Sequence, residues 1–201
     1  MLGRGIFLKN HFPIELSVAN KEPIKPQIVA TKTVARTRLF RIETVDLCFA
    51  NGVETRYERL RSGRHGAVLI VPLLDRETVL LIREYAVGTE RYELALPKGR
   101  VETGETLFAA ANRELMEEVG YGASRLTYLT SLTVAPGYIE HTTHIIVAEK
   151  LYEERRPGDE PEEIGVMPWR LAELPALLAR EDCTEARSIA ALFMVKEKLS
   201  L

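Results

Sequence analysis

Two apolar segments that lie close together in the chain place the strongest limit on its fold. They are GAVLIVPLL at residues 66–74 and TVLLIREYA at residues 78–86, and the turn-like Asp75-Arg76-Glu77 joins them. Because their apolar residues hardly alternate with polar ones, we expect two strands that are buried on both faces. Strands of this kind require a sheet with covering elements on both sides.

The remaining patterns supply those covering elements. Further strands are predicted at 126–136 and 143–152, and helices at 105–119, around 170–180 and at 184–200. The order of strands, helix, strands and helices has no regular βαβ alternation, so we predict an α+β fold with a mixed β-sheet sandwiched between helices. Segment 38–60 alternates polar and apolar residues around Asn51-Gly52, which predicts a β-hairpin as an N-terminal appendage.

The chain is predicted to have three parts, of which composition marks the first. Residues 1–27 end in KEPIKPQ, a stretch rich in proline and lysine that is typical of a linker, so we expect a loosely held, flexible N-terminal extension. Residues 28–62 are predicted to form an N-terminal β subdomain, and residues 63–201 the main domain.

The overall balance of residues excludes several classes of protein. Apolar residues make up 46% of the chain and charged residues 28%, with a net charge of −2, so a soluble globular protein is expected and no nucleic-acid partner. No window approaches the roughly 18 apolar residues of a membrane span, and no signal peptide is apparent. Cys48 and Cys183 have neither zinc spacing nor the density of a disulfide framework. A reduced, cytoplasmic setting is therefore expected.

The helix predicted at 105–119 carries glutamates where apolar residues belong. With Leu107 at 0° and about 100° per residue, Glu114 and Glu118 fall within about 20° of it and Glu117 flanks the buried stripe. Carboxylates this close repel, and more strongly when they are desolvated. A hard divalent cation such as Mg²⁺ would neutralise them. A charged helix edge with Arg113 as salt-bridge partner is the alternative that this geometry leaves open.

The spacing around these glutamates resembles the signature of the Nudix hydrolases, G-x5-E-x7-R-E-U-x-E-E-x-G-U, where U is a bulky aliphatic residue. Every fixed position is present, and only the final U departs from the pattern, being Tyr121; the matching residues are Gly99, Glu105, Arg113, Glu114, Leu115, Glu117, Glu118 and Gly120. The resemblance implies the Nudix fold, with residues 63–201 as the catalytic domain. It also implies hydrolysis of a diphosphate that is linked to another moiety.

The resemblance further implies a metal site. Glu114 and Glu118 would bind the metal, Glu117 would share or support a second ion, and Lys98 would contribute its backbone carbonyl. Glu117 and Glu118 would thereby take part in catalysis. The expected cofactor is Mg²⁺, with Mn²⁺ as a substitute. The structural residues of the motif would be Gly99, Gly120 and an ion pair between Glu105 and Arg113.

Over roughly residues 30–200 the chain is similar to the ADP-ribose pyrophosphatase branch, and within it to the bacterial ADP-compounds hydrolases. The resemblance implies that ADP-ribose, diadenosine oligophosphates and NADH are cleaved to AMP and a second phosphate product. Pro136, sixteen residues beyond Gly120, accompanies ADP-ribose use in this branch, although an ordinary strand-ending turn also explains it. The candidate substrate contacts are Arg83, Glu93, Pro136, Gly137 and Tyr138.

The strand before the motif departs from this branch. Many relatives have Gln-aromatic-Arg where this chain has Glu84-Tyr85-Ala86, so the arginine on the adenine side is missing and Arg83 is the expected substitute. Glu93 lies six residues before Gly99 instead of four. These departures favour broad use of ADP compounds.

A second acidic cluster, Asp159 to Ile164, matches the D-E-x-E-[DE]-I loop of the branch, although alone it would indicate a solvated loop. On that likeness Glu160 is the candidate general base, Glu162 a further metal contact, and Glu163 the alternative base.

Four further expectations follow, the first two from the resemblance and the last two from the residues themselves. In the relatives the N-terminal sheet contacts a second subunit, so residues 28–62 are expected to make the contacts of a homodimer. The rival functions are a GDP-mannose or other nucleotide-sugar pyrophosphatase and a non-catalytic Nudix ligand sensor. His141 and His144 are three residues apart on a strand, which places them on opposite faces and argues against zinc. Trp169 is expected to pack the helix near 170–180 against the sheet.

Overall fold

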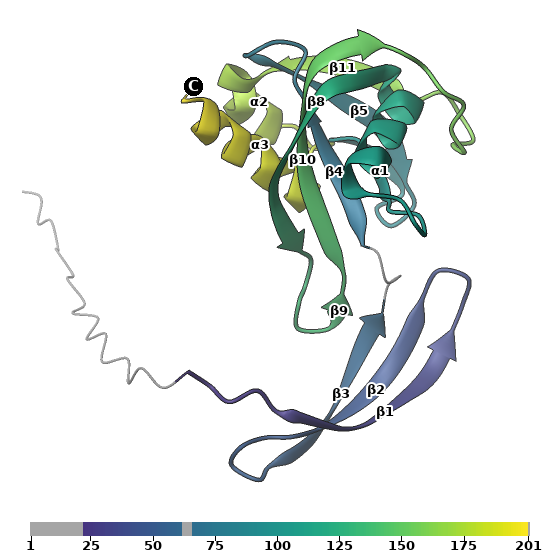
Figure 1. Ribbon diagram of the computed structural model, residues 1–201, viewed down its shortest axis with the longest axis vertical. Helices are drawn as coiled ribbons and strands as arrows, with labels where there is room; N and C mark the ends of the chain where they lie inside the picture. Colours follow the sequence, from purple (N-terminus) through teal and green to yellow (C-terminus); the bar gives the residue numbers. More distant parts are fainter. Residues whose placement is uncertain (1–21, 62–65, 201) are drawn as a thin grey trace, which may run out of the picture.

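The computed structural model describes residues 22–61 and 66–200, which form a helix-covered body with a smaller sheet attached to one end (Figure 1). Residues 1–21 of the predicted extension and the predicted boundary at 62/63 lie outside these described residues. The smaller, N-terminal sheet is antiparallel and contains β1 (Gln27–Arg36), β2 (Arg41–Cys48) and β3 (Glu54–Arg61). Gly52, in the turn between β2 and β3, has a φ of 83°, which glycine adopts without steric cost. The hairpin predicted at 38–60 is confirmed, and β1 adds a strand that was not predicted.

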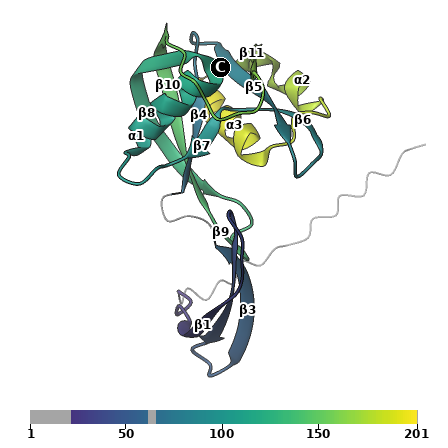
Figure 2. The same cartoon turned by 90° about the vertical axis from the view of Figure 1, so that its right-hand side faces the viewer.

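The N-terminal sheet is fastened to the body by the connection between two long strands. There the short strand β9 (Ile139–Glu140) pairs in parallel with β3, and Leu60 N donates a hydrogen bond to the carbonyl oxygen of Tyr138 at 2.8 Å. Figure 2 shows this sheet standing away from the body, with β9 at the junction. The turn between β1 and β2 points back toward the body near α1 (Figure 1).

The body contains two small sheets. One has the order β7–β4–β10–β8, with β10 and β4 parallel and the other pairs antiparallel. The second has the order β11–β5–β6 and is antiparallel. The strands are β4 (Ala67–Pro72), β5 (Thr78–Ala86), β6 (Arg91–Ala95), β7 (Lys98–Arg100), β8 (Tyr121–Thr133), β10 (Thr142–Glu153) and β11 (Gly165–Arg170).

Helices cover both sides of these strands. On one side lies α1 (Leu107–Glu114), which continues into the π-helix η1 (Leu115–Val119). On the other side lie α2 (Leu174–Leu178), preceded by the 3₁₀-helix η2 (Leu171–Glu173), and α3 (Ala186–Leu199). The predicted α+β class and the mixed sheet between helices are confirmed (Figures 1 and 2).

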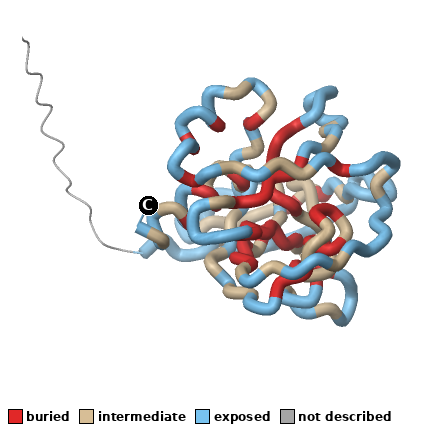
Figure 3. The backbone as a smooth tube through the Cα atoms, turned by 90° about the horizontal axis from the view of Figure 1, so that it is seen from above, coloured by how far each residue is buried: buried red, intermediate tan, exposed pale blue. Residues whose placement is uncertain are grey.

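The core consists of two clusters, and β4 contributes to both. Leu69 and Val71 face the cluster under α2 and α3, whereas Val68 and Ile70 face the cluster under α1. Every residue of β4 is buried, as predicted, because each side of the pleat meets a helix layer. In β5 only residues 79–82 are buried, since the strand then leaves the core. Figure 3 shows the buried segments gathered in the middle of the body.

Some predicted elements need correction. The helix expected at 105–119 begins at Leu107, because Thr106 is its N-cap and accepts a hydrogen bond from Ala109 N. Besides β1, the strands β6, β7, β9 and β11 were not predicted: the first three are short, and β11 contains Pro168, which masks its strand pattern. Trp169 packs against the α2–α3 cluster, in line with its predicted role, and its Nε1 donates to the Glu173 carbonyl oxygen.

Candidate metal and diphosphate site

A cavity of about 1090 Å³ lies between β7, the end of α1, η1 and the loop that joins β10 to β11. Its acidic lining is contributed by Glu84, Glu102, Glu114, Glu117, Glu118, Asp159 and Glu160, and its basic lining by Arg38, Lys98, Arg100 and Arg113. The structure therefore brings together in one hollow the motif glutamates and a glutamate from the second acidic cluster, forty-two residues after Glu118.

Glu118 is the most deeply buried of these carboxylates, with 3% of its surface exposed. Its pKa is raised to about 8, mainly by burial and also by the neighbouring charges of Glu114 and Glu84, while Lys98 acts in the opposite direction. The backbone N–H of Lys98 donates to Glu118 Oε2 at 2.9 Å. A buried carboxylate with a raised pKa in a cavity is a group that a bound cation would stabilise.

Glu114 is held directly against β7. It is 8% exposed, and its pKa is raised by burial and by the nearby carboxylates of Glu117 and Glu160, against the lowering effect of Arg113. A Cβ atom added to Gly99 would lie 1.9 Å from both Cδ and Oε1 of Glu114. Only glycine at position 99 leaves room for the Glu114 carboxylate where it stands.

Arg113 donates hydrogen bonds to the acidic side chains of the motif. Its Nε and Nη2 each donate to the Glu105 carboxylate at 3.1 Å, and Nη2 also donates to the carbonyl oxygen of Arg100 at 3.0 Å. Its Nη1 donates to Glu114 at 2.7 Å and to Glu117 at 3.0 Å. The Glu105–Arg113 pair thus ties the loop before α1 to the helix, and the same guanidinium also neutralises two of the cavity glutamates.

The last turn of this helix is wider than an α-helix. Gly120 N donates to the carbonyl oxygen of Leu115 at 3.1 Å, a bond that spans five residues, and Gly120 has a φ of 82°. The sequence-based prediction assumed a regular α-helix, so the helix type is corrected here, whereas the predicted burial of Glu118 and the flanking position of Glu117 are confirmed. π-helical turns occur often at functional sites because they redirect side chains, and this one keeps Glu118 buried while Glu117 is half-buried.

The donor chemistry of the cavity fits a divalent cation. Carboxylate oxygens are the ligands that Mg²⁺ and Mn²⁺ prefer, and a diphosphate could not approach so many glutamates without cations between them. Among residues 22–61 and 66–200, no three His, Cys, Asp or Glu side chains converge on one point closely enough to hold an ion. Two of the required carboxylates, Glu114 and Glu117, are turned toward Arg113 instead.

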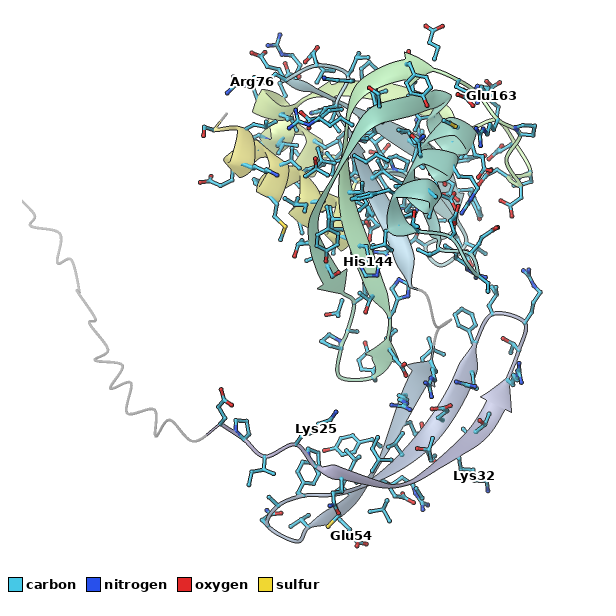
Figure 4. All side chains as sticks on the ribbon, viewed as in Figure 1. Lys25, Lys32, Glu54, Arg76, His144 and Glu163 are labelled. Carbon is cyan, nitrogen blue, oxygen red and sulfur yellow. The ribbon has the colours of Figure 1, made fainter. Side chains whose placement is uncertain are left out.

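The glutamates of the second acidic cluster, residues 159–164, differ in their surroundings and contacts. Glu160 lines the large cavity. Its carboxylate lies so close to Gly158 that a Cβ atom at position 158 would be 2.3 Å from Glu160 Oε2, so the absence of a side chain at Gly158 leaves room for it. Glu162 Oε1 accepts a hydrogen bond from the Tyr92 hydroxyl at 2.6 Å, which raises the pKa of Tyr92. Glu163 is exposed on the loop (Figure 4) and lines an adjoining hollow of about 420 Å³, which shares Glu117 and Glu160 with the large cavity. Glu162 lines that second hollow too and not the large cavity.

The predicted substrate contacts are not gathered in the cavity of this chain. Arg83 points toward Asp182, with 3.7 Å between charged atoms, and its guanidinium lies 6.0 Å from the centre of the Tyr92 ring. Pro136, Gly137 and Tyr138 form the turn that meets the N-terminal sheet. These four assignments stay predictions.

Glu93 is engaged elsewhere in the fold. It accepts hydrogen bonds from Arg91 Nε at 2.7 Å and from Thr184 N at 3.1 Å, just before α3. Burial raises its pKa, but these hydrogen bonds outweigh burial and the net shift is downward. The contacts give Glu93 a structural function that its position in the sequence did not reveal.

Several lining residues were missed by sequence reasoning. Glu84 forms an ion pair with Lys98 Nζ at 2.8 Å inside the cavity, and its place at the polar end of an apolar strand was the signal that could have found it. Arg38 and Leu39 reach the cavity from the turn between β1 and β2. No local sequence pattern predicts that Arg38 and Leu39 line the cavity, because only the position of the N-terminal sheet brings their turn close to it.

Among the residues that the structure describes, the histidines His141 and His144 and the two cysteines do not line this cavity. His144 Nδ1 is hydrogen bonded to Ser131 at 2.9 Å, and His141 Nε2 to Thr143 at 3.1 Å. Figure 4 shows His144 at the end of the body nearest the N-terminal sheet. Cys48 and Cys183 are free thiols. None of the helices in the described part of the chain is both long and apolar enough to cross a membrane.

Comparison with protein families gives two matches that follow one another along the chain. The NUDIX domain matches residues 63–192, and the NudE-type Nudix hydrolase N-terminal domain matches residues 26–59. Both parts of the chain, the N-terminal sheet and the body, are thus represented in families.

Known proteins are similar over most of the chain. The ADP compounds hydrolase NudE of Escherichia coli (strain K12) is 51% identical over 175 residues, which cover 87% of this chain and 94% of that protein. The ADP-ribose pyrophosphatase of Bacillus subtilis (strain 168) is 29% identical over 177 residues, covering 85% and 95%. A crystal structure of an ADP compounds hydrolase superposes with a TM-score of 0.83 at 50% identity, covering 90% of this chain and 97% of the other.

Proposed function

The chain belongs to the Nudix hydrolase family, and from this premise we propose that it hydrolyses the pyrophosphate bond of ADP-containing compounds. ADP-ribose, diadenosine oligophosphates and NADH are the proposed substrates, and AMP and a second phosphate compound the products. The observation that carries this proposal is the 51% identity to an ADP compounds hydrolase over 87% of the chain. Because the match includes the N-terminal sheet, the likeness extends well beyond the motif that all Nudix hydrolases share.

We propose Mg²⁺ as the cofactor, with Mn²⁺ able to replace it. Glu114, Glu117 and Glu118 would hold the ions with the backbone carbonyl of Lys98, and the burial and raised pKa of Glu118 support this assignment. Glu114 and Glu117 would have to turn from Arg113 toward the ions, while Arg113 keeps its bonds to Glu105. When bound, such ions neutralise the diphosphate and make a coordinated water more acidic.

Glu160 is the proposed general base. It lies in the cavity with Glu114 and Glu117, and as a carboxylate it would accept the proton of the water that attacks phosphorus. The bond between that phosphorus and the bridging oxygen then breaks, and the second phosphate leaves with the bridging oxygen. Glu163 is less suited, because it is exposed and lies outside this cavity.

We also propose a homodimer that forms through the N-terminal sheet. Every residue of β1 is exposed, and large apolar side chains of this sheet are exposed as well, namely Ile28, Val29, Val34, Leu39, Phe40, Ile42, Val53 and Tyr57. A surface of this kind is typical of a protein interface. Light scattering coupled to size-exclusion chromatography should give twice the 22.7 kDa mass of one chain. The two free cysteines support a proposed cytoplasmic location.

A substrate panel tests the proposed function. ADP-ribose, NADH, diadenosine triphosphate, ADP-glucose and GDP-mannose are incubated with the protein and Mg²⁺, with and without EDTA, and the products are separated by chromatography. Release of AMP from ADP compounds, abolished by EDTA, is the expected result. A clear preference for GDP-mannose would favour a nucleotide-sugar pyrophosphatase instead.

A further inference from the structure

The loop that carries Glu160 is anchored firmly only at its ends. On one side Arg156 N donates to the carbonyl oxygen of Met116 in η1 at 3.1 Å. On the other side Ile164 is buried in the core cluster under α1. Between them, residues 157–163 are exposed or half-buried, so core packing does not fix their positions.

One side chain from the body reaches this loop. Within the described residues, the bond from the Tyr92 hydroxyl to Glu162 Oε1 is the one side-chain hydrogen bond between residues 157–163 and the rest of the chain. Its length of 2.6 Å is typical of a hydroxyl that donates to a charged carboxylate, which is stronger than a bond between neutral groups.

The donor of this bond is itself held in place. Tyr92 stands on β6 opposite Tyr85 on β5, and the two rings meet edge to face with 5.5 Å between their centres. The Arg83 guanidinium lies 6.0 Å from the centre of the Tyr92 ring. Tyr92 therefore presents its hydroxyl from a paired strand of the body, whereas Glu162 belongs to the exposed loop.

We propose that Tyr92 is a positioning residue, which holds Glu162 and thereby keeps Glu160 in the cavity beside Glu114 and Glu117. Glu160 is two residues before Glu162, and the loop passes so close to η1 that a Cβ at Gly158 would lie 3.6 Å from Glu117 Cβ. This inference rests on the proposed function, because Glu160 acts as the base there. It assigns Glu162 to the hydrogen bond with Tyr92 in place of the predicted metal contact.

The test compares Tyr92→Phe with the wild-type protein by NMR relaxation and by kinetics. The ring and its packing remain in this variant, and only the hydroxyl is lost. Backbone order parameters in residues 158–163 should fall from about 0.85 toward 0.6 or below. The kcat for ADP-ribose should fall about threefold to tenfold, as expected for the loss of one hydrogen bond, while KM changes less than about twofold.

Changes at Glu162 separate the hydrogen bond from metal binding. Glu162→Gln keeps an oxygen that can accept from Tyr92 but loses the charge, so its loop order parameters should lie closer to the wild type than those of Glu162→Ala, and its Mn²⁺ affinity should match the wild type. Glu162→Ala should resemble Tyr92→Phe, and the double variant should be no worse than either single variant. Tyr128→Phe is the matched control, because it removes another hydrogen-bonded tyrosine hydroxyl, on β8 and outside the cavity lining.

Two outcomes would overturn the inference. One is a Tyr92→Phe protein with wild-type order parameters and kcat. The other is a Glu162→Gln protein that binds Mn²⁺ at least about tenfold more weakly, as loss of a metal ligand would cause. If the wild type cleaves no ADP compound, the proposed function fails, yet the order parameters still decide whether Tyr92 holds the loop.

Discussion

Replacing Gly99 by alanine should displace one carboxylate and leave the fold intact. The new Cβ would lie 1.9 Å from Glu114 Cδ, whereas ordinary contact begins at 3.4 Å, so the carboxylate has to retreat by about 1.5 Å. The carboxylate is the far end of a flexible side chain, and Gly99 does not have a positive φ, so the backbone need not change. We expect the free energy of unfolding to fall by no more than about 1–3 kcal/mol.

The same displacement of the Glu114 carboxylate should lower both the affinity for metal and the rate of hydrolysis. To bind the ion, the Glu114 carboxylate would have to turn from Arg113 beside β7, and an alanine Cβ that keeps it about 1.5 Å away denies it ligand distances that are held within about 0.2 Å. Misplacement of a group by about 1 Å can cost about a hundredfold in rate. We therefore expect kcat for ADP-ribose to fall about a hundredfold and the Kd for Mn²⁺ to rise at least about tenfold.

Calorimetric titration with Mn²⁺, thermal melting and chromatographic measurement of AMP provide the three readings. Gly88→Ala is the matched control, because nothing lies within 4 Å of its added Cβ and it lacks a positive φ, and it should behave as the wild type. A folded Gly99→Ala protein that binds Mn²⁺ and turns over ADP-ribose at wild-type levels would refute the reasoning. Glu114 would then not act from the position that Gly99 makes available.

Three further changes probe the site and its surroundings. Glu118→Gln should lower kcat by about two orders of magnitude or more while the fold stays intact, and full activity would contradict the role of Glu118 as a ligand. The pKa of Glu118 is about 8 in the metal-free fold against 4.5 for the ordinary group, so in EDTA its ionisation destabilises the wild type as pH rises from about 4.5 to 8. The Tm of Glu118→Gln relative to wild type should therefore increase over that range, and a constant difference would contradict the burial argument. Glu93→Ala leaves Arg91 and Thr184 N without their acceptor, so melting should show a loss of about 1–3 kcal/mol with kcat/KM within about twofold of wild type. If Glu93→Ala had an unchanged Tm and a large loss of kcat/KM, Glu93 would be a substrate contact, as the sequence predicted, and not a structural residue.

Much of the site could be predicted because its residues are close in sequence. The glutamates of 105–118 share one helix and the loop before it, so their spacing limits their positions before any tertiary contact forms. Glu118 on the apolar face is a good example, since periodicity alone indicated that it is buried. The family resemblance then related Glu160, from a distant loop, to the same cavity.

The remainder depended on contacts between distant parts of the chain. The π-helical turn at residues 115–119 has no distinct sequence pattern, so the change of helix type was not predicted, although Glu118 is buried where regular α-helical rotation placed it. Glu93 and Glu162 are carboxylates and were therefore predicted to bind substrate or metal. Instead, Glu93 accepts a hydrogen bond from Thr184 and Glu162 accepts one from Tyr92, and both donors are far away in sequence. Arg38 enters the cavity lining only because the N-terminal sheet turns back toward the body.

The measurement that most directly tests the central claim is the time course of AMP release from ADP-ribose by the purified protein. With Mg²⁺ present, AMP and ribose phosphate should appear in equal amounts; EDTA should stop the reaction, and added Mg²⁺ should restore it. Hydrolysis that is unaffected by EDTA would contradict the assignment of the buried glutamates to a metal site. The absence of AMP with every ADP compound tested would contradict the proposed activity itself.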